Sequence, residues 1–407
     1  PNCFWPDVAF DGDGRLLVLY TATGGRYNQP LGVWLQRYDG EQPAGSAVRV
    51  AGTEAFHARF AVDGRTVLVV YVQTPPENAD RPLGFEPGAH PILLAISDDG
   101  GSTFFPPVAV SQSGERVAHP SVLVGAGGQV VVGALDYGDD IENYEATHEG
   151  RAGPPPAARW RVVVWRSTNG GFAFGPAVPV SDPYPVPQRV VIDLAPGPSF
   201  AADPVRNRLY ASWDGLRGPN AENSVAGTGT GRDVFVGRSD DFGATWLAPT
   251  RLEPTAESQL LPAVGVAVAP DGRVDTVFYD RSRDPDDVMA EVVVGSSWDG
   301  GATFTTAVAS HAAFDTRIGL GSPQGVPQLG NQLAVLSQAD RFLAFWADTS
   351  QGTIDTNLQD LAVVTVGTSE SGGSRWAVIV LGGLLVAAGA AVLIVSRRQA
   401  RAQPEEP

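Results

Sequence analysis

The 407-residue sequence predicts an all-β protein of six repeated antiparallel units, followed by one membrane-spanning helix. A short turn motif occurs four times, a two-strand pattern occurs six times, and one unbroken apolar run of 20 residues lies near the C-terminus. The 48 glycines and 33 prolines, which interrupt short apolar segments, favour many short strands over long helices.

The turn motif reads Ser-x-Asp/Asn-x-Gly-x-Thr/Ala-aromatic. Its four copies are Ser97–Phe104, Ser167–Phe174, Ser239–Trp246 and Ser297–Phe304. The Asp or Asn side chain can accept hydrogen bonds from the backbone of its own turn, and the glycine adopts a positive φ at little cost. The aromatic residue can pack on the sheet edge. The motif therefore predicts four hairpin turns with a structural role.

A second pattern, two strands flanking a tight turn, precedes each motif. Its six copies are Pro6–Tyr20, Ala58–Tyr71, Pro120–Tyr137, Phe200–Trp213, Pro262–Tyr279 and Gln332–Trp346. Two strands here and two around the turn motif make a four-stranded unit, and six such units predict a six-bladed β-propeller. The first unit has a degenerate motif at Arg37–Gly40 and the last has none, as is common for terminal repeats.

The expected topology separates the loops onto two faces. Turns in an antiparallel sheet alternate between its ends, so the tight hairpins and the turn motifs share one face. The long segments share the other: Gln73–His90, Asp136–Arg159, Ser181–Pro198, Asp214–Arg232, Asp280–Val288 and His311–Gln328. Polar residues gather there, and all five histidines lie on this face or at strand ends beside it: His57, His90, His119, His148 and His311. Long loops on one face predict a functional face, although solvated loops collect polar residues in any case.

The segment Trp376–Val395 is apolar throughout and uncharged, and its 20 residues are enough for a helix to cross a bilayer. A Gly/Ser spacer (367–375) precedes it, and Arg397, Arg398 and Arg401 follow it. Because basic residues stay on the cytoplasmic side, we expect a single-pass protein of the cell membrane. Its ectodomain (1–366) lies outside, and its tail (396–407) is cytoplasmic.

The composition excludes some functions. The net charge of −17 argues against a nucleic-acid partner, whose phosphates would be repelled. Cys3 is the one cysteine, so the chain has neither an intrachain disulfide nor a cysteine-based metal site. The chain begins with Pro1 and shows no signal peptide, so we expect any secretion signal to precede it.

The four turn motifs resemble the Asp-box (BNR) repeats of the sialidase superfamily, over roughly residues 4–366. The resemblance implies a glycan partner and an exo-α-sialidase-class glycoside hydrolase. Such enzymes hold the sugar carboxylate with three arginines, and they use a Tyr–Glu nucleophile and an Asp acid/base. The family's Arg-Ile-Pro signature is absent, and the nearest string is Arg317-Ile318-Gly319.

The resemblance implies site residues among those on the loop face. Candidates for the carboxylate clamp are Arg59, Arg189, Arg281 and Arg317. The candidate catalytic residues are Tyr137 or Tyr144 paired with Glu142, and Asp136 as acid/base. The alternative for Asp136-Tyr137 is structural, because Trp213-Asp214 and Tyr279-Asp280 also place an aromatic beside an Asp at strand ends.

Several alternatives remain open on the sequence. A non-catalytic protein that binds a glycan or a protein at the membrane surface fits the same face, and the missing Arg-Ile-Pro favours it. A role in the assembly of membrane complexes is a third possibility. No cofactor is expected, with Ca²⁺ at Asp284–Asp287 and a transition metal at His57 and His119 as minor alternatives.

Overall fold

The computed structural model describes residues 2–24, 29–73, 90–138, 159–185, 197–216, 232–252, 264–284, 286, 288–318, 329, 333–368 and 378–379. Their strands form six antiparallel sheets of four or five strands, so the all-β prediction is confirmed. Within these ranges the one helical turn is the 3-10 turn η2 (Ala126–Gly128). Most of the long predicted loops lie outside the described residues.

The first three sheets follow one another along the chain. The first contains β1 (Asn2–Phe10), β2 (Leu16–Gly24), β3 (Gln29–Asp39), β4 (Gln42–Pro43) and β5 (Val48–Ala51). The second contains β6 (Ala55–Asp63), β7 (Thr66–Gln73), β8 (Ile92–Ser97) and β9 (Val108–Ala109). The third contains β10 (Val117–Val124), β11 (Val130–Asp136), β12 (Arg159–Ser167), β13 (Val178–Pro179) and β14 (Tyr184–Pro185).

The last three sheets repeat this order. The fourth contains β15 (Ser199–Asp203), β16 (Arg208–Leu216), β17 (Arg232–Ser239) and β18 (Thr250–Arg251). The fifth contains β19 (Val264–Val268), β20 (Val274–Asp280), β21 (Met289–Ser297), β22 (Thr305–Val308) and β23 (Phe314–Asp315). The sixth contains β24 (Ala334–Ser337), β25 (Arg341–Asp348), β26 (Asp360–Gly367) and β27 (Val378–Ile379).

Each predicted two-strand unit is the first hairpin of one sheet, and each turn motif joins the third strand to the fourth. The motif and the hairpin turn of the same sheet lie side by side. The amide of Gly100 donates to the carbonyl of Arg65 over 2.9 Å, and the amide of Phe242 donates to the carbonyl of Asn207 over 3.1 Å. The prediction that both kinds of turn share one face is confirmed.

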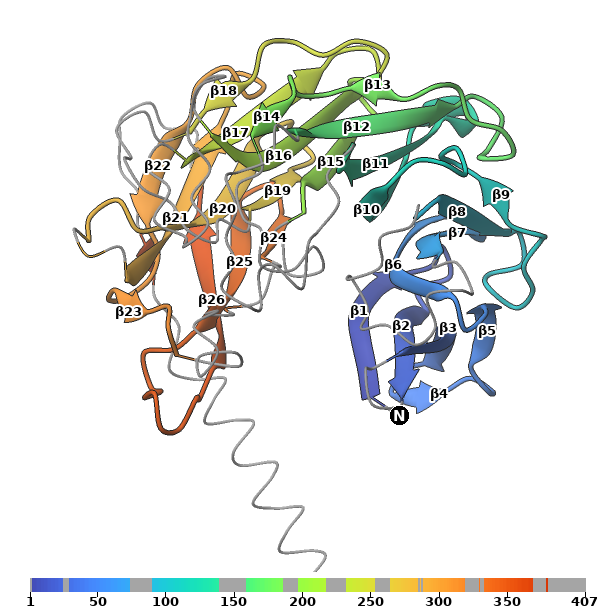
Figure 1. Ribbon diagram of the computed structural model, residues 1–407, viewed down its shortest axis with the longest axis horizontal. Helices are drawn as coiled ribbons and strands as arrows, with labels where there is room; N and C mark the ends of the chain where they lie inside the picture. Colours follow the sequence, from blue (N-terminus) through green and yellow to red (C-terminus); the bar gives the residue numbers. More distant parts are fainter. Residues whose placement is uncertain are drawn as a thin grey trace, which may run out of the picture.

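The sheets pack face to face in chain order. Five apolar clusters of buried side chains fill the five interfaces between consecutive sheets, from the first sheet to the sixth. A sheet covered on both faces buries both sides of its middle strands, so β11 and β20 are buried at every position. Figure 1 shows the six sheets as an arc from the blue β1 to the orange β26. The ring closure of a six-bladed propeller stays a prediction.

The turn motifs are held by their own side chains. In the second sheet, the Ser97 hydroxyl donates to Asp99 over 2.8 Å and accepts the Gly101 amide over 2.9 Å. Asp99 also accepts the amide and the hydroxyl of Thr103, over 2.9 and 2.7 Å. These bonds, above all that from the Thr103 hydroxyl, hold the pKa of Asp99 well below its usual range.

The motifs also join neighbouring sheets. A Cβ built on Gly101 would lie 2.3 Å from Leu35 of the first sheet, so the turn contacts its neighbour closely. Arginines of third strands reach across to the next motif. Arg166 donates to the carbonyl of Phe242 over 3.1 Å, and Arg238 donates to the carbonyl of Gly300 over 2.9 Å. The motifs therefore have the structural role predicted from their sequence.

No helix among the described residues is long and apolar enough to cross a membrane. The predicted span, 376–395, lies outside the described residues except at Val378–Ile379. These two residues form β27, which pairs with β26 at Val366 and Thr365, and so they differ from the helix expected there. The anchor and the domain boundaries drawn from it stay predictions.

Candidate functional site

The first strands of the first three sheets share an unusual feature at the same position. Each carries a β-bulge: between Phe4 and Asp7 in β1, between Phe56 and Arg59 in β6, and between Ala118 and Ser121 in β10. Bulges re-aim side chains and are common beside functional sites.

The residue that opens each bulge is not glycine, yet its φ is positive. The values are 47° at Trp5, 49° at His57 and 53° at His119. The left-handed region is uncommon for residues with a Cβ and costs free energy, so such residues tend to cluster at ligand sites. Three equivalent cases in neighbouring strands indicate one constructed site.

The three rings lie in a row at the centre of the molecule. The ring centres of Trp5 and His57 are 4.5 Å apart at an angle of 82°, and those of His57 and His119 are 4.6 Å apart at 31°. Gly197 packs against His119 at the end of the row, because a Cβ on Gly197 would lie 2.4 Å from Cβ of His119. A side chain at position 197 would therefore displace that histidine.

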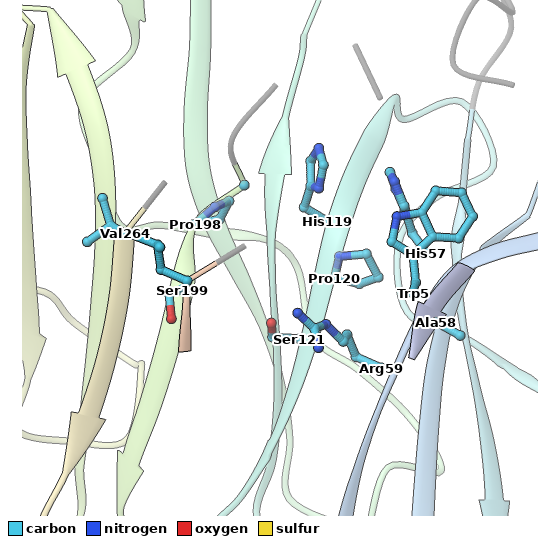
Figure 2. Close-up of a pocket in the computed structure, with 12 residues that line it drawn as sticks. Trp5, His57, Ala58, Arg59, His119, Pro120, Ser121, Pro198, Ser199 and Val264 are labelled. Atoms are coloured by element: carbon cyan, nitrogen blue, oxygen red, sulfur yellow. The ribbon is translucent and has the colours of Figure 1, made fainter. Parts of the chain in front are cut away.

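A pocket of about 80 Å³ opens beside these rings (Figure 2). The first strands of five sheets contribute to it, together with Leu333, the residue before the first strand of the sixth, so it lies where the first strands converge. Its lining comprises Trp5, His57, Ala58, Arg59, His119, Pro120, Ser121, Gly197, Pro198, Ser199, Val264 and Leu333. Figure 2 shows the rings of Trp5, His57 and His119 together, with Arg59 and Ser121 below them. We call this set the central pocket.

Arg59 of the central pocket contacts the carboxylate of Asp7, which is not itself a lining residue. Its NH1 atom lies 3.6 Å from Oδ1 of Asp7, and both side chains are partly exposed. Asp7 also accepts the amides of Val8 over 3.0 Å and Phe60 over 3.3 Å. Burial raises the pKa of Asp7, whereas the Arg59 guanidinium and the two amides lower it less. A carboxyl with a raised pKa beside a pocket can donate a proton.

The other predicted site residues lie elsewhere or outside the described residues. Arg281 and Arg317 lie together near Asp315, to which Arg317 donates over 2.6 Å, and neither arginine lines the central pocket. Among the described members of the predicted clamp, Arg59 is thus the one that lines the pocket. Arg189, Glu142, Tyr144 and His148 lie outside the described residues.

Asp136 and Tyr137 have structural surroundings. Asp136 accepts a bond from Arg161 over 2.7 Å and from the Gly138 amide over 2.8 Å. Tyr137 is completely buried, with its ring edge-on to Trp160 at 4.9 Å. The structure places both in the packing of the third sheet, away from the central pocket.

The described residues contain no group of three side chains that could bind a metal ion. Asp284 uses its carboxylate within its own loop, where it accepts the amides of Val288 over 2.7 Å and Met289 over 2.6 Å. These two bonds, that from Met289 first, lower the pKa of Asp284. Asp287 lies outside the described residues.

Sequence reasoning missed Trp5, Asp7 and Ser121. Trp5-Pro6 and His119-Pro120 repeat the same signal, a ring followed by proline at the start of a first strand, and His57-Ala58 is its variant. This repeat, taken with the register of the units, could have found the central pocket.

No protein-family model and no curated protein matches the sequence. Among solved structures, the chain is similar to the α-L-arabinanase of Penicillium chrysogenum complexed with arabinobiose. The identity is 12%, the match covers 89% of this chain and 93% of that one, and the TM-score is 0.48.

It is also similar to the Trypanosoma rangeli sialidase and to a PL25 ulvan lyase. The sialidase has 12% identity, coverage of 100% of this chain and 59% of that one, and a TM-score of 0.49. The lyase has 11% identity, coverage of 91% and 81%, and a TM-score of 0.48. Because all three TM-scores lie below 0.5, the function proposed below rests on the residues of this chain.

Proposed function

We propose that the protein binds a glycan in the central pocket. The observation that carries the proposal is the row of three left-handed residues, Trp5, His57 and His119, which the bulges of three neighbouring strands turn into one pocket. An aromatic face packs on the apolar face of a sugar ring, and imidazoles exchange hydrogen bonds with hydroxyls. The guanidinium of Arg59 adds a partner for a carboxylate on an acidic sugar.

A glycan array probed with the full chain in detergent tests the proposal, followed by calorimetry with the best glycan. We expect Trp5→Ala to weaken binding at least tenfold, about 1.4 kcal/mol. Trp298→Ala, in the exposed turn motif of the fifth sheet, is the matched control and should bind normally. Equal affinity of Trp5→Ala and the parent protein, both folded by their thermal transitions, would reject the central pocket as the glycan site.

Hydrolysis of α-sialosides is the second candidate function. It is favoured by Asp7, a carboxyl with a raised pKa beside Arg59. In this proposal Arg59 binds the sugar carboxylate, and protonated Asp7 donates its proton to the glycosidic oxygen as the bond from that oxygen to the anomeric carbon breaks; water then supplies the hydroxyl on that carbon. Asp136, predicted from the sequence as the acid, is the rival donor.

The two acids can be separated with a fluorogenic α-sialoside between pH 4 and pH 8. Asp7→Asn should abolish turnover, while Asp136→Asn should retain it, because Arg59, the ion-pair partner of Asp7, lines the central pocket and Arg161, the partner of Asp136, does not. Loss in Asp136→Asn alone would assign the acid to Asp136. Absence of turnover in a folded parent protein that still binds glycans would leave the binding function and reject the sialidase.

We also propose that the sheets lie outside the cell on a single membrane anchor. Support comes from the apolar segment 376–395, the Gly/Ser spacer before it and the arginines after it. Protease treatment of intact cells should remove residues 1–366 and leave the tail protected. Protection of the sheets in intact cells would reverse the proposed orientation.

A further inference from the structure

A second cavity lies between the third and fourth sheets, on residues that do not line the central pocket. Its volume is about 640 Å³, within the range of sites for small organic ligands. Its lining includes Asp182, Tyr184, Trp213, Phe235, Trp246 and Leu247. We call it the inter-sheet cavity.

Aromatic rings form one wall of the inter-sheet cavity. Trp213 of β16 and Phe235 of β17 are paired across the sheet, and their rings stack at 5.9 Å and 22°. Trp246, the last residue of the turn motif in the fourth sheet, and Tyr184 of the third sheet complete the set. Phe235 and Trp246 are only partly buried, so a ligand can reach them.

Two glycines on the same sheet face hold this arrangement. A Cβ on Gly237 would lie 3.1 Å from the Trp213 ring and 3.4 Å from the Trp246 ring. A Cβ on Gly215 would lie 3.3 Å from Phe235. The rings therefore lie flat against the backbone, in positions that larger residues at 215 or 237 would disturb.

The described side chains that line the inter-sheet cavity carry negative charge only. Asp182 is the one charged side chain among the described lining residues, and it is exposed. The hydroxyl of Ser181 already accepts the amide of Val162 over 2.9 Å. An anion would therefore meet a carboxylate and no basic side chain among these residues.

We propose that the inter-sheet cavity binds an organic cation of the alkylammonium class. A cation is attracted electrostatically to an aromatic face, and clusters of aromatic residues are a common site for quaternary ammonium groups. The Asp182 carboxylate supplies the matching charge. The apolar residues Leu247, Pro183 and Pro249 contact the carbon skeleton of the ligand.

Choline and 3,3-dimethylbutan-1-ol test this proposal, because they share a shape and differ in charge. Tryptophan fluorescence of the full chain in detergent should report saturable choline binding, with the neutral alcohol at least tenfold weaker. Equal affinity for the two would overturn the ligand class. Lack of saturable binding by choline up to millimolar concentration would overturn the site.

Substitutions locate the binding. Asp182→Asn, an exposed change that leaves the core intact, should weaken choline binding several-fold without altering the affinity for the alcohol. Trp246→Leu should remove binding of both, while Trp246→Phe should retain part of it. The matched controls are Asp98→Asn and Trp298→Leu, which lie in exposed turns of other sheets. Unchanged choline affinity in Asp182→Asn and Trp246→Leu would overturn the assignment.

The inter-sheet cavity and the central pocket can be tested separately. Trp5→Ala, which should impair glycan binding, should leave choline binding unchanged, because Trp5 lines only the central pocket. Loss of choline binding in Trp5→Ala would place the cation in the central pocket and overturn the proposal.

Discussion

Arg273 and Asp275 form a buried ion pair that fastens the fifth sheet to the sixth. The Nε atom of Arg273 lies 3.0 Å and 3.1 Å from the two oxygens of Asp275, and their side chains are 1% and 0% exposed. Arg273 also donates to the carbonyl of Gln338 over 2.7 Å and to the Thr368 hydroxyl over 2.6 Å. Asp275 accepts the hydroxyl of Ser337 over 2.7 Å. Both charges are thus fully hydrogen-bonded across the boundary between the sheets.

Arg273→Met should destabilise the protein strongly. It leaves the Asp275 charge buried without its partner, which typically costs about 3–5 kcal/mol. The control is Arg283→Met, whose ion pair with Glu291 is exposed and should contribute less than about 1 kcal/mol. Urea unfolding measures both, and equal small effects would contradict the structural role of the buried pair.

The aspartate of the turn motif should make the unfolding free energy depend on pH in the acidic range. Burial alone would raise the pKa of Asp299, but hydrogen bonds from Thr303 and Ser297 lower it to about 2. A carboxyl with a lowered folded pKa stabilises the protein above its unfolded pKa of 3.8, and the gain is lost as pH falls toward 2. The unfolding free energy of the parent protein should therefore fall over this window.

Asp299→Asn should abolish that part of the acid dependence and leave the fold intact. The third sheet carries the natural precedent, Asn169, which accepts the Ser167 hydroxyl over 2.7 Å and the Ala173 amide over 3.0 Å. Parent and variant should differ in stability at pH 5 and converge near pH 2. A constant difference over this range would contradict the role given to ionised Asp299.

Gly101→Ala should cost more stability than Gly14→Ala. Both glycines have φ near +80°, so each alanine incurs a left-handed penalty of about 1–2 kcal/mol. Only at Gly101 does the new Cβ meet a neighbour, Leu35 at 2.3 Å, and overpacking adds about 1–3 kcal/mol. Thermal unfolding compares them. Equal losses of stability would show that Leu35 moves away from the new Cβ at no cost in free energy, which would contradict the prediction.

Local signals in the sequence predicted most of the fold. The motif Ser97–Phe104 contains the Ser97 and Asp99 side chains and the groups that bind them, so most of its turn structure follows from eight residues. The hairpins followed from apolar pairs on either side of a tight turn. Inter-sheet contacts such as Arg166 with Phe242 join residues 76 apart, and no local pattern encodes them.

The central pocket was harder to predict. Arg59 was named because it begins a first strand on the loop face, and it lies in the pocket. Arg281 is predicted to end a second strand on the same face, yet it does not line the pocket, and its charge lowers the pKa of Asp315. Trp5, His57 and His119 each adopt the left-handed conformation within a β-bulge. This conformation is uncommon for residues other than glycine, so the identity of a single residue does not predict it. Only the comparison of three repeats reveals it.

The raised pKa of Asp7 should make the unfolding free energy depend on pH. Burial raises the folded pKa of Asp7 above its ordinary value of 3.8, so the folded state keeps this proton to higher pH than the unfolded state does. The unfolding free energy should therefore fall as pH rises through the folded pKa. Once Asp7 ionises, the folded protein holds a partly buried charge, which Arg59 compensates only in part.

Asp7→Asn should accordingly stabilise the protein at pH 7 and leave its stability unchanged at pH 3, where Asp7 is protonated in both states. Residues of functional sites often carry such a cost in stability. Asp13→Asn, at an exposed carboxylate paired with exposed Arg15, controls for the loss of one negative charge. Chemical denaturation at both pH values measures the effect. A variant less stable than its parent at pH 7 would show that the attraction of Arg59 outweighs the burial of the Asp7 charge.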